Sequence, residues 1–204
     1  MKTIFWNVDT QYDFMRADGK LPVQDAQAIE PNLEKLTEFA RQNGYQVINT
    51  GDLHNEDDEE LAEDPDFVNT FPQHCMRDTP GARFVEATLP RDAYVIDWQD
   101  NFLDLAKAAK AKEIVLYKNK FDIFAGNRHA DRVVETLRPD RAIVYGVATN
   151  VCVDCAVKGL LERNVEVYAV RDAIKELPNL PLDPVLQQWR DLGAKLVYTK
   201  DVVR

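Results

Sequence analysis

Short apolar runs alternate along the chain with longer segments in which apolar residues recur every three or four positions. The short runs are typical of strands buried on both faces of a sheet. We expect strands at Thr3–Val8, Tyr45–Thr50, Ala93–Ile96, Glu113–Tyr117, Ala142–Tyr145 and Val165–Val170, with a weaker candidate at Lys195–Tyr198.

The intervening segments have the periodicity of amphipathic helices. Ile29, Leu33, Leu36 and Phe39 fall on one face of a helix that Gly44 would terminate. Three further helices are indicated by the apolar sets Phe102, Leu105 and Ala109; Val133, Val134 and Leu137, ending near Pro139; and Ala156, Leu160 and Leu161.

Alternation of strands and helices favours an α/β fold. We expect a three-layer α/β/α sandwich around a mainly parallel sheet of about six strands, with ligands bound at the carboxyl ends of the strands. The stretch from Gly51 to Pro90 breaks the alternation and is rich in Asp, Glu and Pro, which predicts a long functional loop. No linker interrupts the pattern, so residues 1–204 are expected to form a single domain.

Composition narrows the function classes. The formal net charge is -10 and no long basic run occurs, which argues against nucleic-acid binding. No apolar stretch approaches a membrane span, and the N-terminal run lacks the features of a signal peptide. The three cysteines, Cys75, Cys152 and Cys155, are too few for a disulfide framework. We therefore expect a cytoplasmic protein that acts on a small molecule and has no nucleic-acid or membrane partner.

Cys152 lies where an apolar strand passes into a predicted helix, in YGVATNVCVDCAVKG. Unpaired N–H groups and the helix dipole at such a position would lower the thiol pKa and favour a nucleophile. A buried structural cysteine is the simpler interpretation of the residue type alone. Cys152 and Cys155 also form C-x-x-C, which would suit a thiol–disulfide redox protein, although Cys155 is more simply a core residue.

Asp9 and Lys118 each end a predicted strand. Taken singly, they would be interpreted as a turn aspartate and a solvated lysine. Together with Cys152 they would place an acid, an ammonium and a thiol at one edge of the sheet. There the carboxylate can accept the thiol proton while the ammonium stabilises the anions.

Two of the three histidines, His54 and His74, fall in the long loop region. Asp52 and His54 are one residue apart after a strand, so in extended chain their side chains point the same way. Two imidazoles with carboxylates suit zinc, iron or manganese better than calcium. The alternative is a pair of surface histidines in an acidic loop.

These segments, in order, resemble the isochorismatase-like cysteine hydrolases, and within them the nicotinamidase/pyrazinamidase branch. The resemblance rests on D-x-Q-x-D-F from Asp9 to Phe14, DLH at Asp52–His54 followed by FPQHCMRDTPGARF, YKNKFDIFAG around Lys118, and GVATNVCV around Cys152. It extends from Met1 to about Asp172.

The resemblance implies a catalytic triad of Asp9, Lys118 and Cys152. It also implies a cis peptide at Val147–Ala148 that helps aim the N–H groups of Ala148 and Cys152 into an oxyanion hole. One divalent transition metal (Zn, Fe or Mn) would be held by Asp52, His54 and His74, with Glu60 as the leading fourth ligand. A homo-oligomer is also expected.

The expected reaction is amide hydrolysis through a Cys152 thioester, with nicotinamide converted to nicotinic acid and ammonia, a step of NAD salvage. Phe14 and Phe71 are expected to sandwich the pyridine ring, although ordinary core packing explains either one alone. The alternatives are a ureidoacrylate- or N-carbamoyl-type amidase, an isochorismate hydrolase, a C-x-x-C redox protein and a catalytically inactive binding protein.

Overall fold

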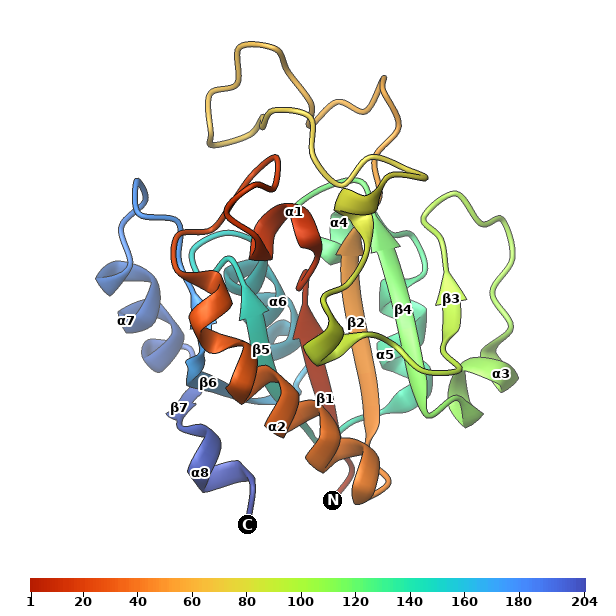
Figure 1. Ribbon diagram of the computed structural model, residues 1–204. Helices are drawn as coiled ribbons and strands as arrows, with labels where there is room; N and C mark the ends of the chain where they lie inside the picture. The colour runs from red at the N-terminus through yellow and green to blue at the C-terminus, as the bar shows by residue number, and fades with distance from the viewer.

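Seven parallel strands form one sheet in the computed structural model, which describes residues 1–204 (Figure 1). The strands are β1 (Thr3–Val8), β2 (Gln46–Asp52), β3 (Tyr94–Ile96), β4 (Glu113–Lys118), β5 (Arg141–Val147), β6 (Glu166–Lys175) and β7 (Lys195–Val197). Their order is β3-β4-β2-β1-β5-β6-β7, and every neighbouring pair is parallel. The α/β class is confirmed. The sheet has one strand more than the expected number, because the weak candidate at the C-terminal end pairs with β6.

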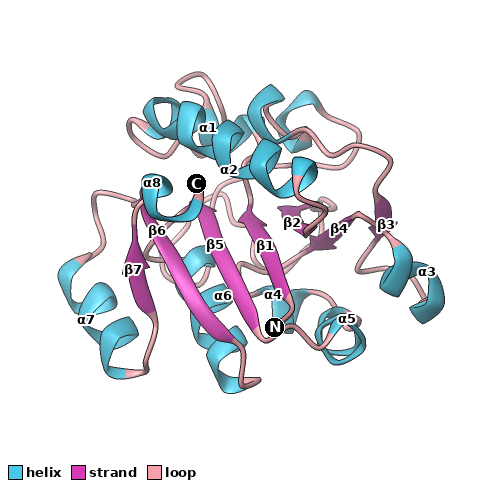
Figure 2. Cartoon of the chain, turned by 90° about the horizontal axis from the view of Figure 1, so that it is seen from below, coloured by secondary structure: helices cyan, strands magenta, loops and turns pink.

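Helices cover both faces of the sheet, as the views in Figures 1 and 2 show. They are α1 (Tyr12–Met15), α2 (Glu30–Gln42), α3 (Leu105–Lys110), α4 (Ile123–Gly126), α5 (Ala130–Leu137), α6 (Cys152–Glu162), α7 (Asp183–Asp191) and α8 (Thr199–Val202), with short 3-10 turns at Ala26–Ile29, Pro80–Ala82 and Glu86–Thr88. None of these helices combines the length and the apolar character needed to cross a lipid bilayer.

The central strand β1 contributes side chains to two hydrophobic cores, one on each face of the sheet. Ile4, Trp6 and Val8 point into the core beneath α5, α6 and α7, whereas Phe5 points into the core beneath α2. This alternation follows from the two-residue period of a strand. Since both faces are covered, nearly every residue of β1 is buried and the strand is recognisable as an apolar run.

One predicted helical face is wrong. Phe102 is 78% exposed and lies in the loop before α3, and Ala108 is the one buried residue of that helix. The predicted face of Phe102, Leu105 and Ala109 does not form because α3 is short and lies beside the three-residue edge strand β3. A helix at that position has little core to cover.

The segment between β2 and β3 contains no helix or strand beyond two 3-10 turns, in agreement with the predicted long loop. It rises above the carboxyl ends of β2 and β4 in Figure 1, where it is drawn in gold and yellow. The residues that follow β2 are therefore held directly over the tips of the central strands.

Gly146 provides a test of how closely β1 and β5 approach each other at this edge. Its φ is +120°, and a Cβ there would lie 2.0 Å from the carbonyl oxygen of Val8. We expect Gly146→Ala to lower the free energy of unfolding by more than about 3 kcal/mol, because backbone strain and overpacking add. Gly44→Ala is the matched control, since its φ is +72° with no atom near the added Cβ; its cost should be about 1–2 kcal/mol. Equal urea midpoints for the two variants would contradict this interpretation.

Candidate active site

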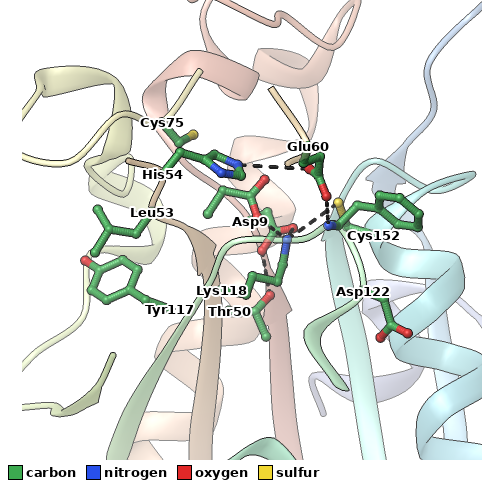
Figure 3. Close-up of polar contacts among 12 residues, drawn as sticks. Asp9, Thr50, Leu53, His54, Glu60, Cys75, Tyr117, Lys118, Asp122 and Cys152 are labelled. Carbon is green, nitrogen blue, oxygen red and sulfur yellow. Dashed lines mark hydrogen bonds and ion pairs between the residues drawn. The ribbon is translucent and has the colours of Figure 1, made fainter. Parts of the chain in front are cut away.

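Four titratable side chains meet at the carboxyl ends of neighbouring strands, and three of them, Asp9, Lys118 and Cys152, are labelled in Figure 3. Asp9 follows β1, Asp52 ends β2, Lys118 ends β4, and Cys152 begins α6 after β5. The order β4-β2-β1-β5 makes these strand tips adjacent, and Asp52 pairs in register with Lys118. All four side chains are buried. The structure therefore brings together the three residues of the predicted triad and adds Asp52 to them.

The Lys118 ammonium is the centre of this group. Its Nζ lies 3.0 Å from Asp9 Oδ2 and 3.8 Å from Cys152 Sγ, and it donates a hydrogen bond to Asp52 Oδ1. The other oxygen of Asp9 accepts a hydrogen bond of 2.7 Å from the Thr50 hydroxyl. One oxygen each of Asp9 and Asp52 and the sulfur of Cys152 lie within 4.8 Å of one another. The acid is thus within reach of the thiol.

The carboxyl groups of Asp9 and Asp52 have pKa values shifted in opposite directions, although both groups contact Lys118. Burial raises the pKa of Asp9, and the nearby Asp52 carboxylate adds to this effect, while Lys118 opposes it. Burial by itself would also raise the pKa of Asp52, but Lys118 and His74 together lower that pKa below the ordinary value. Burial alone would lower the pKa of Lys118, and the two carboxylates raise it well above the ordinary value. We infer that Asp9 is the carboxyl group better suited to accept and return a proton.

The expectation that the helix start lowers the pKa of Cys152 is wrong. Burial raises its pKa well above the ordinary value, and the carboxylates of Asp9, Asp52 and Glu60 raise it further. Lys118 opposes this shift. The resting side chain is therefore a neutral thiol, and it becomes a thiolate when a neighbouring base accepts the proton.

Two unpaired backbone donors lie beside the thiol. The peptide between Val147 and Ala148 is cis, as expected from the resemblance. Neither the N–H of Ala148 nor the N–H of Cys152 donates a hydrogen bond within the protein, whereas the Ala148 carbonyl accepts from Val151 and Val153. Free N–H groups next to a nucleophile are the donors that an oxyanion hole requires.

A second group of side chains joins the first at Asp52. One ligand atom from each of its members lies within 4.8 Å of the others; the members are Asp52, His54, Glu60 and His74. All four are buried. The structure thus brings together the four residues expected to bind a metal. Loop residues far apart in the sequence meet here because the long segment folds back over the end of β2.

The two imidazoles are oriented as metal ligands usually are. His54 Nδ1 lies 3.1 Å from an oxygen of Asp58, and His74 Nδ1 lies 2.7 Å from the carbonyl oxygen of Pro72. Both partners are acceptors, so each Nδ1 carries a hydrogen, and Nε2 is the nitrogen of each ring that faces the other members of the group. His54 Nε2 is buried without a hydrogen-bond partner. An orphaned acceptor facing carboxylates fits a cation.

The carboxylates that face these nitrogens also suit a bound cation. His74 Nε2 lies 3.3 Å from Asp52 Oδ2, and His54 Nε2 lies 4.0 Å from Glu60 Oε1. Burial raises the pKa of Glu60 to about 7, and the Asp52 carboxylate adds to this effect. Two imidazole nitrogens and two carboxylates form a donor set that suits zinc, iron or manganese.

Gln11 and Asp13 hold these groups in place, a role that the sequence analysis did not assign to them. The Gln11 amide accepts from the backbone N–H of Asp52 at 2.7 Å and donates to the Asp52 carbonyl at 2.7 Å. Asp13 accepts from the N–H of Cys75, directly after His74, at 2.7 Å. The spacing D-x-Q-x-D could have indicated this role, because it places all three polar side chains in one buried turn.

A narrow apolar pocket that is partly open to solvent lies above the thiol. Phe14 and Phe71, expected to contact substrate, both line it. The pocket has further apolar walls that the sequence analysis missed: Leu21, Val23, Phe121, Val151 and Leu177. They come from separate loops and the start of α6, and no periodicity connects them.

Cys155, the other half of the C-x-x-C, lies one helical turn further along α6. All three cysteines are free thiols. Burial raises the pKa of Cys155 to about 12, as it also raises that of Cys152, but Cys155 belongs neither to the cluster around Asp9 nor to the pocket lining. This geometry gives no support to the redox alternative.

Comparison with known proteins agrees with the fold and defines the class. The family model described as the isochorismatase domain matches residues 96–201, just over half of the chain. That range includes Lys118, Ala148 and Cys152, but not Asp9 or the four residues of the candidate metal site. The fold and this match define an isochorismatase-like α/β protein, and the chain belongs to the isochorismatase family.

Individual relatives have low sequence identity to this chain. The nicotinamidase/pyrazinamidase of Mycobacterium tuberculosis is 30% identical over 99 residues, which cover 43% of this chain and 50% of that protein. The pyrazinamidase of Pyrococcus horikoshii in complex with zinc superimposes with a TM-score of 0.78 at 24% identity, covering 97% of this chain and 99% of that one. The N-carbamoylsarcosine amidase of Thermoplasma acidophilum superimposes with a TM-score of 0.73 at 21% identity, covering 98% and 97%. Both structures share the fold with this chain.

Replacing Lys118 tests its structural role. Lys118→Met would leave two buried carboxylates without their cation, a change that typically costs about 3–5 kcal/mol. We therefore expect a large drop in the free energy of unfolding, measured by urea denaturation of the metal-free protein. Lys120→Met is the control, because Lys120 is exposed and pairs only with exposed Glu59; it should change stability by less than about 0.5 kcal/mol. Equal effects of the two substitutions would refute the role given to Lys118.

Proposed function

We propose that this protein is a metal-containing cysteine amidohydrolase, with nicotinamide as its substrate. One observation carries the proposal. The Cys152 thiol lines an apolar pocket and is buried beside the Lys118 ammonium and the Asp9 carboxyl. The same pocket is lined by Asp52, Glu60 and His74 of the candidate metal site. A substrate in it would contact both groups.

The positions of these groups support the following reaction. Asp9 accepts the thiol proton, and the thiolate attacks the carboxamide carbon. The oxygen becomes an oxyanion that accepts hydrogen bonds from the N–H groups of Ala148 and Cys152. Asp9 returns its proton to the amide nitrogen as the C–N bond breaks, so ammonia leaves and a thioester remains. Asp9 then deprotonates water, which attacks the thioester, and the proton returns to Cys152 as the acid is released.

Lys118 acts through its charge. It contacts the Asp9 carboxylate and lies 3.8 Å from the sulfur, so it stabilises the negative charge whichever of the two groups carries it. The raised pKa of Lys118 keeps the ammonium protonated throughout. Asp9 carries the proton, and Lys118 stabilises the buried site both when the proton is on Cys152 and when it is on Asp9.

Asp52, His54, Glu60 and His74 would hold one divalent ion, zinc, iron or manganese. When bound, the ion supplies a Lewis-acid site that accepts a substrate donor atom. The pyrazinamidase of Pyrococcus horikoshii was solved in complex with zinc, which supports a metal in this family. The orphaned Nε2 of His54 gives the same indication from this chain alone.

Nicotinamide fits both halves of the site. Its carboxamide would lie over Cys152, its flat ring between Phe14 and Phe71, and its ring nitrogen towards the metal residues. The relative in Mycobacterium tuberculosis is named nicotinamidase/pyrazinamidase. The structural likeness to an N-carbamoylsarcosine amidase keeps an N-carbamoyl or ureido amide as the second candidate.

Cys152 is the residue on which turnover depends most. Cys152→Ala should abolish ammonia release from nicotinamide, because it removes the atom that forms the thioester. Cys155→Ala is the matched control in the same helix and should retain most of the activity. Ammonia release should be measured for both variants with metal-replete protein. Activity in the Cys152 variant, or its loss in the Cys155 variant alone, would contradict the assignment and favour the redox alternative.

The substrate is tested by comparing nicotinamide with benzamide, which has the same amide but lacks the ring nitrogen. We expect a kcat/KM for benzamide lower by about 100-fold, because orientation of the ring through its nitrogen is lost. Removal of the metal with a chelator should reduce nicotinamide turnover sharply, and adding zinc, iron or manganese should restore it. Equal rates for the two amides would direct the assignment to the carbamoyl and ureido amides.

A further inference from the structure

Asp58 is a buried carboxylate that lies next to the candidate metal site without belonging to it. It follows His54 by four residues, in an acidic run whose neighbouring members Asp57 and Glu59 are exposed. Its Oδ2 lies 3.1 Å from His54 Nδ1, and the four metal-site residues do not include it. Burial of one carboxylate among exposed acidic neighbours requires partners for both of its oxygens.

Those partners anchor Asp58 on two sides. Oδ2 also accepts from the backbone N–H of Asn55 at 3.0 Å, and Oδ1 lies 3.5 Å from the side-chain nitrogen of Asn119. Asn119 directly follows Lys118 at the end of β4. Asp58 therefore links the loop that carries His54 to the strand that carries the buried lysine, and its own orientation is fixed.

The contact with His54 determines which nitrogen of the ring carries the hydrogen. An ionised carboxylate only accepts, so His54 Nδ1 is the donor, and in the neutral ring Nε2 is then bare. That bare Nε2 is the buried atom without a partner, 4.0 Å from Glu60. His74 Nδ1 instead donates to the backbone carbonyl of Pro72, so only the Nδ1 contact of His54 depends on a side chain.

We propose that Asp58 is the positioning residue of the metal site: it fixes the tautomer and the ring orientation of His54 so that Nε2 faces the metal position. The inference rests on the proposed function, because it presupposes a metal bound by His54. A carboxylate behind a ligating imidazole also makes the imidazole a better donor, and loss of such a partner typically weakens metal binding by about 10–100-fold.

The first test needs no metal. The chain has 3 histidines, so ¹⁵N-histidine spectra of the metal-free protein should resolve each ring. In the parent and in Asp57→Ala, His54 should be protonated on Nδ1. In Asp58→Ala, His54 should shift to a mixture of tautomers, while His74 should stay unchanged. A role of Asp58 confined to the turn at Asn55 would leave the His54 tautomer unaltered.

The second test measures Co²⁺ affinity and the visible spectrum of the Co²⁺-loaded protein. Asp58→Ala should weaken binding by about 100-fold and alter the spectrum, whereas Asp57→Ala, which removes the same charge from the same loop, should do neither. Asp58→Asn keeps an acceptor oxygen and should lose about 10-fold, and it decides the matter if Asp58→Ala does not fold. Unchanged affinity in a folded Asp58 variant overturns the inference alone, while absence of Co²⁺ binding by the parent overturns the metal site and this role together.

Discussion

The ammonium of Lys118 is buried between two carboxylates, and the rest of the site depends on that contact. Lys118, Asp9 and Asp52 are each no more than 1% exposed, so all three charges have been removed from water. Such a cluster is stable only when each charge is compensated, because an isolated buried ion is very costly. One ammonium does not balance the carboxylates of Asp9, Asp52 and Glu60. A divalent cation among Asp52, Glu60 and the two imidazoles would balance them, which is the electrostatic reason for the proposed metal.

The same contact explains how a thiol with a raised pKa can serve as a nucleophile. In the proposed reaction the proton moves between Cys152 and Asp9, two groups whose pKa values burial raises together. Transfer between them changes where the negative charge lies but not the total charge next to Lys118. A buried site can therefore generate a thiolate for the time it is needed, without exposing it to water or oxidants at rest.

Sequence reasoning located the groups that lie at strand ends. Asp9, Asp52, Lys118 and Cys152 each follow an apolar run, and parallel strands carry such residues to one edge whatever the details of packing. It failed where tertiary contacts decide. In the acidic run from Glu56 to Glu60, only the resemblance singled out Glu60 and nothing singled out Asp58, whereas the folded loop buries both. Likewise, the helix start alone suggested a lowered pKa for Cys152, whereas burial among carboxylates has the larger effect.

In the proposed reaction the substrate acyl group is bound to Cys152 as a thioester, and trapping that intermediate is the decisive experiment. Metal-loaded protein turning over saturating nicotinamide would be quenched in acid, and its peptides analysed by mass spectrometry. We expect the peptide containing Cys152 to gain the mass of one nicotinoyl group, and this adduct to release nicotinic acid at neutral pH. A nicotinoyl group on Cys155, or steady ammonia release without any acylated peptide, would contradict the proposed reaction.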